Sequence, residues 1–533
     1  MQPAGPPTHQ TDLFRNPPPA NWRAAMSFRL TAKLLLRSTL LLALVSPAAY
    51  AAPTGKITIA VPSEPGTLDP MRSNNRYNHT FNANMFEALY IRDSRAELVP
   101  GLAESVNIST DGLTYTFKLR RGVRFHDGST MTADDVKFSM DRATNPATKN
   151  PMGAYLKAIE KVDIANPDTI VVKLKERDGT FLKKLAFAGW VIPRKYFESV
   201  GEEGFARRPI GSGPFKFKSR SINESIELEA NELHRSHVPK VKDLVYRTIP
   251  EDAVRLAELQ TGRVDIATEM PPPLMERIEA LRDVKAVSHP SGAVYWVVFN
   301  VKDGKDNPVT KLKVRQALNY GIDKQAIIKG VLRGQATQVA GALVPSITPA
   351  DPTLKPYPYD PAMARKLLAE AGYPNGLKVE MYSSVGRYTL DKDISLAIAN
   401  SLKTVGVEVD LKLWESSKWV GDLGKKYYPM SYQEFGNTIF DPEGLMIFGV
   451  HTKAFWSFYT NPQVDKLIDE SMAIIDSKQR DAHFHKIDRL MHEDASHIFL
   501  WESKIVMGVK DKLNWTPASG DTWFKFWDAS WQK

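Results

Sequence analysis

Apolar and polar residues alternate along many short stretches of the chain, and this alternation predicts strands. In LTYTFKL, Leu113, Tyr115 and Phe117 would face one side of a strand and the polar residues between them the other. The dipeptides Arg121-Gly122 and Asp127-Gly128 predict turns on either side of the short run VRF. Further runs of strand character cover residues 56–61, 164–174 (with a turn at Asn166-Pro167-Asp168), 214–219, 225–230, 264–268, 293–301, 377–384, 407–415, 498–502 and 505–509.

Apolar residues at helical spacing predict helices between these strands. Val136, Met140 and Ala143 repeat at that spacing, and the hydroxyl of Thr132 can accept an amide of the first turn. Other helices are predicted at residues 82–90, 251–262, 312–332, 361–371 and 391–405, with two more inside 464–495. Strands and helices are therefore mixed, with more strands in the first half, which is typical of an α/β protein.

Residues 26–51 have the layout of a secretory signal peptide, and residues 1–25 form an N-terminal extension before it. A basic leader with Arg29, Lys33 and Arg37 precedes the apolar residues 38–45, and the small-x-small sequence Ala49-Tyr50-Ala51 follows. We expect cleavage after Ala51, with translation starting at Met1 or Met26. The alternative, a retained membrane anchor, is disfavoured because the apolar run is too short to span a bilayer.

Composition narrows the compartment and the class of protein. The chain has 533 residues and a net charge of +9, but residues 1–51 hold five basic side chains and one acidic one, which leaves +5 on the rest. This mild excess contains no long basic run, so it does not favour nucleic-acid binding. The absence of cysteine excludes disulfides, zinc–thiolate sites and a lipid anchor on an N-terminal cysteine. We expect a periplasmic protein, secreted through its signal peptide and not lipid-anchored.

Four polar residues near the first turn pair, His126, Asp127, Asp134 and Asp135, could indicate a metal or catalytic site. Asp134 and Asp135 would also suit the positive end of a helix dipole, and His126 stands beside a tight turn. No second cluster of ligands occurs at metal spacing, so the capping role is favoured.

Six motifs together resemble one known family. They are SEPGTLDP (63–70), residues 97–142 with the TYTFKLRRGVRFHDG core, GSGPFKF (211–217), RLAELQTGRVDI (255–266), VRQALNYGIDKQAII (314–328) and ARKLLAEAGYP (364–374). In this order they resemble the family 5 extracellular solute-binding proteins, the dipeptide, oligopeptide and nickel type that serves ABC transporters. The resemblance implies a receptor with no catalytic residue and no cofactor.

The resemblance also implies a fold and its boundaries. The expected fold is a two-lobed α/β periplasmic-binding-protein fold of type II, in the large class with an extra subdomain and mixed sheets. Lobe I would comprise residues 52–85, 211–292 and 505–533, its extra subdomain 86–210, and lobe II 293–504. Two hinge segments are expected near Ala293–Asn300 and Trp501–Val509, with the ligand in the cleft between the lobes.

Asp441 is the first candidate for ligand binding. It lies in the stretch 437–470, and in peptide-binding relatives an aspartate of the corresponding segment pairs with the α-ammonium of the ligand. The alternative is that Asp441 is a turn residue, because Asp-Pro favours turns. A buried charge of the ligand would in either case need a partner of opposite charge.

Several other residues are candidates for the cleft. Trp414, Trp456, Phe440, Tyr432 and Trp296 could form apolar walls, and for each the alternative is ordinary core packing. Arg387 follows a predicted strand and could hold a ligand carboxylate in a bidentate manner. Its alternative is a surface ion pair with Asp391 or Asp393.

Histidines are candidate metal ligands because some members of the family carry chelated nickel. His451 lies ten residues after Asp441 and is a weak candidate, since a lone histidine is more often solvated. His485, Asp488 and His492 share a helix face at ligand spacing, but we expect this face to be solvated because Phe484, Ile487 and Met491 form the buried stripe. No metal is therefore predicted.

The sequence favours a receptor for a small solute, and a short peptide or peptide-like amine is the first expectation. The alternatives within the fold are a nickel-chelate, opine or sugar receptor, and the alternative from another class is a periplasmic hydrolase. The motifs G-K-[ST], H-E-x-x-H and G-x-S-x-G are absent. We expect a monomer that delivers its ligand to an inner-membrane ABC permease, with ATPase subunits on other chains.

Overall fold

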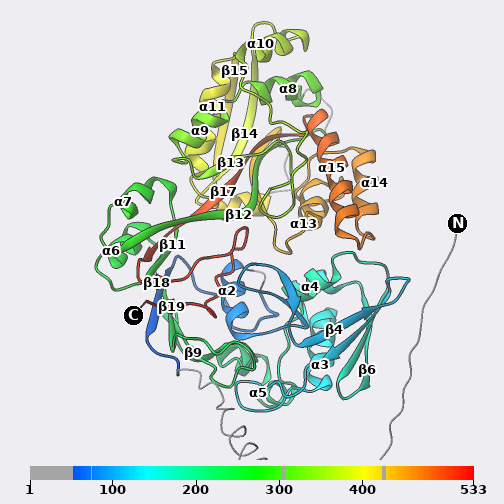
Figure 1. Cartoon of the computed structure of the whole chain (residues 1–533). Helices are drawn as coiled ribbons and strands as arrows, with labels where there is room; N and C mark the ends of the chain where they lie inside the picture. The colour runs from blue at the N-terminus through cyan, green and yellow to red at the C-terminus, as the bar shows by residue number, and fades with distance from the viewer. Residues whose placement is uncertain (1–51, 74, 303–306, 423–427, 533) are drawn as a thin grey trace, which may run out of the picture. The chain divides into compact units, whose positions relative to one another are not determined.

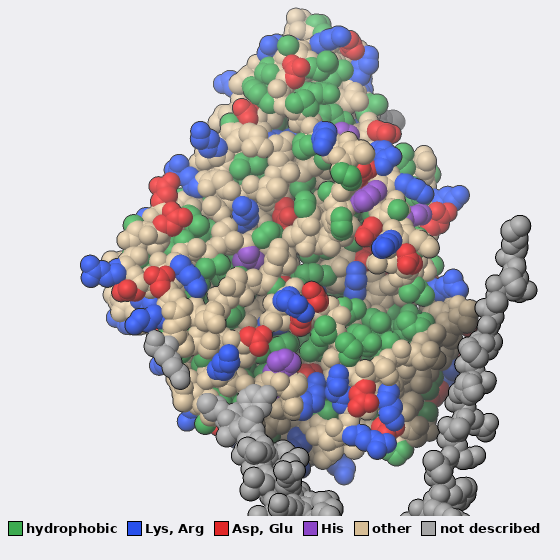
Figure 2. Space-filling view, in the orientation of Figure 1, with side chains coloured by type: hydrophobic (Ala, Val, Ile, Leu, Met, Phe, Trp, Pro, Cys, Tyr) green, Lys and Arg blue, Asp and Glu red, His purple; other side chains and the backbone are tan. Residues whose placement is uncertain are grey.

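The computed structural model describes residues 52–532 apart from residues 74, 303–306 and 423–427 (Figure 1). The predicted signal peptide lies outside the described residues. No helix within the described part of the chain is long and apolar enough to cross a membrane. Figure 2 shows basic and acidic side chains interspersed over the visible face, so this face presents no field of a single sign.

One mixed sheet of eleven strands organises most of the described chain. Its order is β15 (Val407–Glu415), β14 (Leu377–Val385), β16 (Met430–Gly436), β12 (Val284–Phe299), β17 (His497–Lys510), β11 (Ile266–Met270), β1 (Lys56–Val61), β10 (Asp243–Thr248), β9 (Ser225–Ala230) and β8 (Phe215–Ser221), while β13 (Ala336–Gln338) pairs with β17. The parallel pairs are those of β14 with β15 and β16 and of β1 with β10 and β11, and the other neighbours in the sheet are antiparallel.

The two longest strands, β12 and β17, connect the halves of this sheet (Figure 1). The sequence predicts a shorter strand at 293–301 and two separate strands at 498–502 and 505–509, whereas each region is one continuous strand. Their antiparallel pairing shifts register between Pro290 and Val294, where Gly292 has a φ of +70°. Such an irregularity bends the strand, and it lies beside the cavity described below.

A second antiparallel sheet, β4 (Ala103–Ile108), β5 (Thr114–Leu119), β7 (Thr169–Leu174) and β6 (Ile159–Asn166), lies in the first half of the chain. Two small sheets pair β2 (Tyr90–Arg92) with β3 (Leu98–Pro100) and β18 (Leu513–Asn514) with β19 (Ser530–Trp531). The helices of the first half are α2 (Arg76–Met85), α3 (Ala133–Thr144), α4 (Phe181–Ala188), α5 (Arg194–Arg207), α6 (Asp252–Gln260) and α7 (Met275–Glu279).

The helices of the second half are α8 (Leu312–Tyr320), α9 (Lys324–Gly330), α10 (Pro361–Glu370), α11 (Asp391–Lys403), α12 (Ser416–Asp422), α13 (Glu443–Leu445), α14 (Pro462–Ser471) and α15 (Ser477–Glu493). The helix predicted at 312–332 is two helices, because Asp323 caps a new start by accepting the amide of Ala326. The helix predicted at 82–90 is displaced to Arg76–Met85, where Asn75 provides the cap.

Buried apolar side chains form four separate clusters. The first contains residues from β1 to β10 together with the C-terminal aromatic residues 515–527, and the fourth, small cluster lies around α6 and α7. The second and third are built from residues 294–501. Cores that pack separately on either side of β12 and β17 can move relative to one another if those strands bend. The predicted boundaries of the lobes and the subdomain stay a prediction.

The motif around His126 is structural. Thr132 donates both its backbone amide and its hydroxyl to the carboxylate of Asp135, each at 2.8 Å, which confirms the predicted helix start. His126 lies between the backbone of Gly211 and that of Gly213, with Nε2 3.0 Å from the Gly213 carbonyl. Burial lowers the pKa of His126 to about 4, so the ring is neutral and holds the GSGP turn in place.

The face of α15 that carries His485, Asp488 and His492 is covered by residues 340–349 and is not a solvated face. His485 Nε2 lies 2.7 Å from the carbonyl of Pro349, and His492 Nδ1 lies 2.8 Å from that of Ala340. The carboxylate of Asp488 is 2% exposed and accepts the amide of Ala342. The three side chains therefore each hold a different point of this segment.

Burial raises the pKa of Asp488 to about 6, against an ordinary value of 3.8. A raised carboxyl pKa means that the folded state holds the proton more tightly, so stability falls as pH rises from about 4 to above 6. The difference between the two pKa values of Asp488 corresponds to about 3 kcal/mol of unfolding free energy. We expect the stability of Asp488→Asn, which keeps one acceptor oxygen, not to fall as the pH rises. Urea unfolding at pH 4.5 and pH 7.5 measures the difference, with the exposed Asp469→Asn as control; equal pH dependence of the wild type and Asp488→Asn would contradict the expectation.

Candidate functional site

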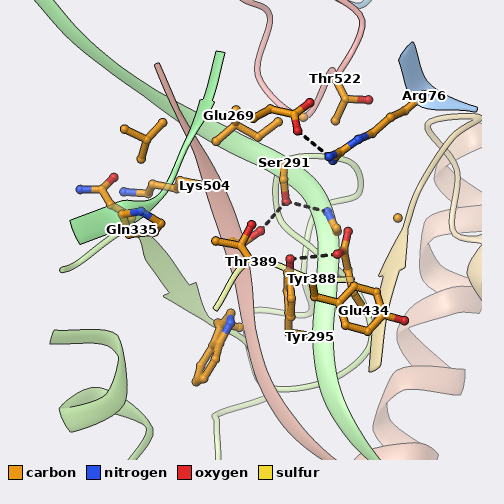
Figure 3. Close-up of a pocket in the computed structure, with 18 of the residues that line it drawn as sticks. Arg76, Glu269, Ser291, Tyr295, Gln335, Tyr388, Thr389, Glu434, Lys504 and Thr522 are labelled. Atoms are coloured by element: carbon orange, nitrogen blue, oxygen red, sulfur yellow. Dashed lines mark hydrogen bonds and ion pairs between the residues drawn. The ribbon is translucent and has the colours of Figure 1, made fainter. Parts of the chain in front are cut away.

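A cavity of about 1170 Å³, its open mouth included, lies where β12 and β17 pass between the buried clusters (Figure 3). One wall comes from the first half of the chain and its C-terminus, with Arg76, Glu269, Met270 and Trp523. The opposite wall comes from residues 293–440, and β17 contributes Ser503 and Lys504.

The topology of the sheet brings charged residues to this cavity. β14 and β16 are parallel neighbours, so their carboxyl ends reach the same edge of the sheet. Arg387 and Tyr388 follow β14, and Glu434 lies near the end of β16; all three line the cavity. Ligands of open α/β sheets commonly bind at this edge.

Glu434 is held by the strand beside it. It lies opposite Tyr295 in the antiparallel pair of β16 with β12, and the Tyr295 hydroxyl donates a 2.9 Å hydrogen bond to the Glu434 carboxylate. Burial raises the pKa of the Glu434 carboxyl, although the guanidinium of Arg76 and the Tyr295 hydroxyl oppose this shift. A cation placed beside Glu434 would therefore be favoured, because it would stabilise the ionised carboxylate.

Glu269 and Arg76 form an ion pair across the mouth of the cavity. Arg76 Nη2 lies 2.5 Å from Glu269 Oε2, and the hydroxyl of Tyr77 donates to the same oxygen at 3.1 Å. Glu269 has a φ of +52° at an irregular point of the pairing between β11 and β17. This irregularity turns its side chain to the cavity, where Arg76 neutralises it.

Arg387 and Lys504 bring positive charge to the cavity without a close ion pair to any described residue. Neither has an ion-pair partner among the described residues, and the guanidinium of Arg387 donates to the hydroxyl of Tyr388 at 3.1 Å. The carboxylate of Asp391 accepts the backbone amides of residues 386–388, so it holds the loop and not the guanidinium. An arginine held in this way can bind a carboxylate with two parallel hydrogen bonds.

The cavity thus combines one acid and two bases that form no close ion pair with described residues and can therefore contact a ligand. Among the described residues, Glu434 has no ion-pair partner within the protein, as is also the case for Arg387 and Lys504. Ser291, Gln335 and Asn437 add neutral hydrogen-bonding groups, and Trp501, Trp523 and Phe440 add apolar surface. This arrangement suits a dipolar solute with one amine and one or two carboxylates.

Two of the residues predicted from the sequence line the cavity, namely Arg387 and Phe440. Phe440 has a φ of +56°, and its ring stacks on the guanidinium of Arg92, which lies 3.9 Å from the ring centroid. The other face of that guanidinium lies 4.0 Å from the ring centroid of Trp523. The sandwich fixes Phe440 as part of the cavity wall.

Asp441 lies in a buried ion cluster and is not among the residues that line the cavity. Its carboxylate is bound by Arg480, with Nη2 2.8 Å from Oδ1, and by Lys183, with Nζ 2.9 Å from Oδ2. Burial would raise the pKa of Asp441, but the charges of Lys183 and Arg480 hold it below its usual range. The carboxylate of Asp441 is thus already paired with two cationic side chains of the protein itself.

The four remaining aromatic candidates lie in packed surroundings. Trp296 and Tyr432 are fully buried, in different clusters, and Trp296 stacks on His497 with ring centroids 4.3 Å apart. Trp414 packs edge-on against Tyr382 and is covered by the ammonium of Lys418. Trp456 lies beside the guanidinium of Arg387, 5.8 Å from its ring centroid. None of the four is among the residues that line the cavity.

His451 approaches two acids without forming a metal-binding group. Its ring nitrogens lie 3.8 Å from Asp465 and 3.5 Å from Asp469, and Nδ1 accepts the amide of Lys453. Within the described residues, no group of three or more His, Cys, Asp or Glu side chains could hold a metal ion.

Sequence reasoning did not identify five residues that line the cavity: Arg76, Glu269, Tyr295, Glu434 and Lys504. One signal was available, since Glu434 is an acid inside the otherwise apolar and neutral run MSYQEFG. A charged side chain in such a strand is rarely buried without a partner, so Glu434 could have been singled out as a candidate. The other four lie on segments whose meeting depends on the sheet order.

Geometry and topology together define a class of protein, a two-part α/β binding protein with a ligand cavity between its parts. A family model for the bacterial extracellular solute-binding proteins, family 5, matches residues 97–456. The chain therefore belongs to this family, as its motifs suggested.

Relatives and solved structures agree with this assignment. The chain is 32% identical over 492 residues to the glutathione-binding protein GsiB of Pectobacterium atrosepticum, covering 88% of this chain and 93% of that protein. It is 29% identical over 519 residues to GsiB of Escherichia coli K12, covering 92% and 97%.

The fold is similar to that of the periplasmic binding protein DppA of Helicobacter pylori in complex with the peptide STSA, with a TM-score of 0.76 and 25% identity over 90% of this chain and 99% of that one. It is also similar to NikA of Brucella suis in complex with Fe(III)-EDTA, with a TM-score of 0.81 and 22% identity over 90% of this chain and 100% of that one. The predicted two-lobed type II α/β fold is thereby confirmed.

Proposed function

We propose that this solute-binding protein is the periplasmic receptor of an ABC importer for a short peptide or peptide-like amine. The observation that carries this proposal is that one acid, Glu434, and two bases, Arg387 and Lys504, line a single cavity without a close ion pair to any described residue. An amine would lie at Glu434 and carboxylates at the two bases, because buried ligand charges need partners.

Glutathione satisfies this charge pattern, since it carries one amine and two carboxylates. The relatives named above as glutathione-binding proteins support it as the first ligand to examine. The ion pair of Arg76 with Glu269 adds no net charge, so the balance of one negative and two positive groups is retained.

The receptor would act by trapping its ligand and releasing it unchanged. Ligand contacts to both walls favour the conformation in which the walls are close, and a membrane permease recognises that conformation. ATPase subunits on other chains would drive transport. The chain would work as a monomer in the periplasm after removal of residues 1–51, with no catalytic residue and no cofactor.

A ligand screen tests this function. Residues 52–533 are incubated with reduced glutathione, a neutral tripeptide amide, a nickel–histidine complex and a disaccharide, and the thermal midpoint is followed as a function of ligand concentration. Glutathione at 100 times its Kd should stabilise the fold by about 2.7 kcal/mol by mass action. Mass spectrometry should recover the glutathione intact. Saturable stabilisation by the disaccharide or the nickel complex alone, or a cleaved product, would contradict the proposal.

A further inference from the structure

A cluster of six charged side chains, all buried except the partly exposed Lys183, joins helix α4 to helices α13 and α15, which lie above it in Figure 1. Lys183 Nζ lies 2.9 Å from the carboxylate of Asp441 and 3.0 Å from the carbonyl of Phe440. Lys184 Nζ lies 2.5 Å from the carboxylate of Glu443 and 2.7 Å from that of Asp178. Arg480 completes the cluster, with Nη2 within 2.9 Å of both Asp441 and Glu443.

These contacts join parts that pack into different cores. Phe181 and Leu185 of α4 belong to the first buried cluster, whereas Leu445 beside Glu443 and Phe484 beside Arg480 belong to the third. Ile439 is an exception, because it precedes Asp441 in the sequence but is buried in the first cluster. The ion cluster is therefore an interface between two parts of the chain whose apolar side chains pack in different buried clusters.

The charges on the two sides are complementary. The α4 side carries Asp178, Lys183 and Lys184, a net charge of +1, and the other side carries Asp441, Glu443 and Arg480, a net charge of −1. The side chains of Asp441, Glu443 and Arg480 are 3%, 2% and 4% exposed. The net charges of the two sides cancel when the sides meet. The hydroxyl of Thr180 also donates a hydrogen bond to the carboxylate of Glu443 at 2.6 Å.

The interface lies directly beside the ligand cavity. Phe440, which lines the cavity, precedes Asp441, and its carbonyl accepts the hydrogen bond of Lys183. On the neighbouring segment, the amide of Gly179 donates to the carbonyl of Met472 at 2.8 Å. Any separation of the two parts would break these contacts and move one wall of the cavity.

We propose that this ion cluster is a latch that holds the two parts together in the absence of ligand, with Lys183 as the positioning residue that joins them. The contacts are complete without any ligand atom, so the latch sets the population of the closed conformation before binding. Ligand affinity then depends on that population, because only closed molecules hold the ligand with both walls. The inference does not depend on which solute is bound.

Distance measurements in the ligand-free protein test the latch. The chain contains no cysteine, so Glu160→Cys and Gln463→Cys, both at exposed positions on opposite sides, give a unique pair of labels. Single-molecule energy transfer then reports the ratio of closed to open molecules. Lys183→Met should lower this ratio about tenfold, the effect of losing one charge-assisted hydrogen bond between partly buried groups.

Two further variants separate a latch from a general loss of stability. Lys183→Arg keeps the charge and should restore the ratio to near the wild-type value. Lys175→Met removes one lysine from an exposed position whose ammonium donates a hydrogen bond to the carbonyl of Lys157, away from the ion cluster, and it should leave the ratio unchanged. An unchanged ratio in Lys183→Met, an equal effect of Lys175→Met, or a ligand-free wild type that is entirely open would each overturn the proposal.

Discussion

Replacing Glu434 by glutamine is expected to weaken the binding of an amine-bearing ligand by at least about 30-fold. Glu434 is the one acid of the described cavity lining without an ion-pair partner in the protein, and burial already raises the pKa of its carboxyl. Loss of one partner of a buried charge pair typically costs about 2–5 kcal/mol, and each 1.4 kcal/mol is a factor of ten. Calorimetric titration of wild type and variant with glutathione measures the loss.

The neighbouring strand offers a matched control for this substitution. Glu380 on β14 accepts a hydrogen bond from Tyr382 at 2.7 Å, as Glu434 does from Tyr295, but Glu380 is not among the residues that line the cavity. Glu380→Gln should leave the affinity unchanged. The wild type should also bind N-acetylglutathione weakly, and the two glutamine variants should bind it equally. An unchanged affinity of Glu434→Gln for glutathione would show that Glu434 does not contact the ligand.

Replacing Trp296 by alanine is expected to destabilise the fold by about 3–5 kcal/mol. The side chain is fully buried beside Val294, Val298 and Phe499, so its removal leaves a large cavity in the third cluster. It also loses its stacking partner His497. Chemical denaturation followed by circular dichroism measures the change, and the affinity of the molecules that remain folded should stay close to that of the wild type.

Trp414→Ala is the control for this second prediction. Trp414 is only partly buried and packs at the margin of the same cluster, with Lys418 above its ring. Its removal should cost less than half as much as that of Trp296. A Trp296→Ala variant of wild-type stability with a large loss of affinity would instead place Trp296 in ligand binding, as the sequence had allowed.

Local patterns predicted most of the elements that carry the fold. Residues 56–61 were predicted as a strand and form β1 with the same bounds, and the start of α3 after Thr132 follows from its own capping residues. These features depend on interactions between residues that are close in the sequence, so they can be predicted from it directly. The elements that were misjudged, such as the long strands β12 and β17, owe their length to pairing partners far away in the chain.

The candidate site was harder to predict, for a different reason. Arg387 and Phe440 could be proposed because each stands at the end of a predicted element or beside a family motif. Asp441 was proposed on the same grounds, but its environment depends on Arg480 and Lys183, which are 39 and 258 residues away. No local pattern reports whether a carboxylate is already neutralised by such distant cations.

The sequence by itself determined the α/β class, the family and the likeness to a receptor, because these depend on periodicity and on the order of motifs. Only the tertiary structure decided which charges meet in the cavity. Glu269, Glu434 and Lys504 come from three strands that the strand order of one sheet brings together, and Arg76 joins them from helix α2. Electrostatic partnership acts through space, so the free acid and bases of the site could be recognised only once those distances were known.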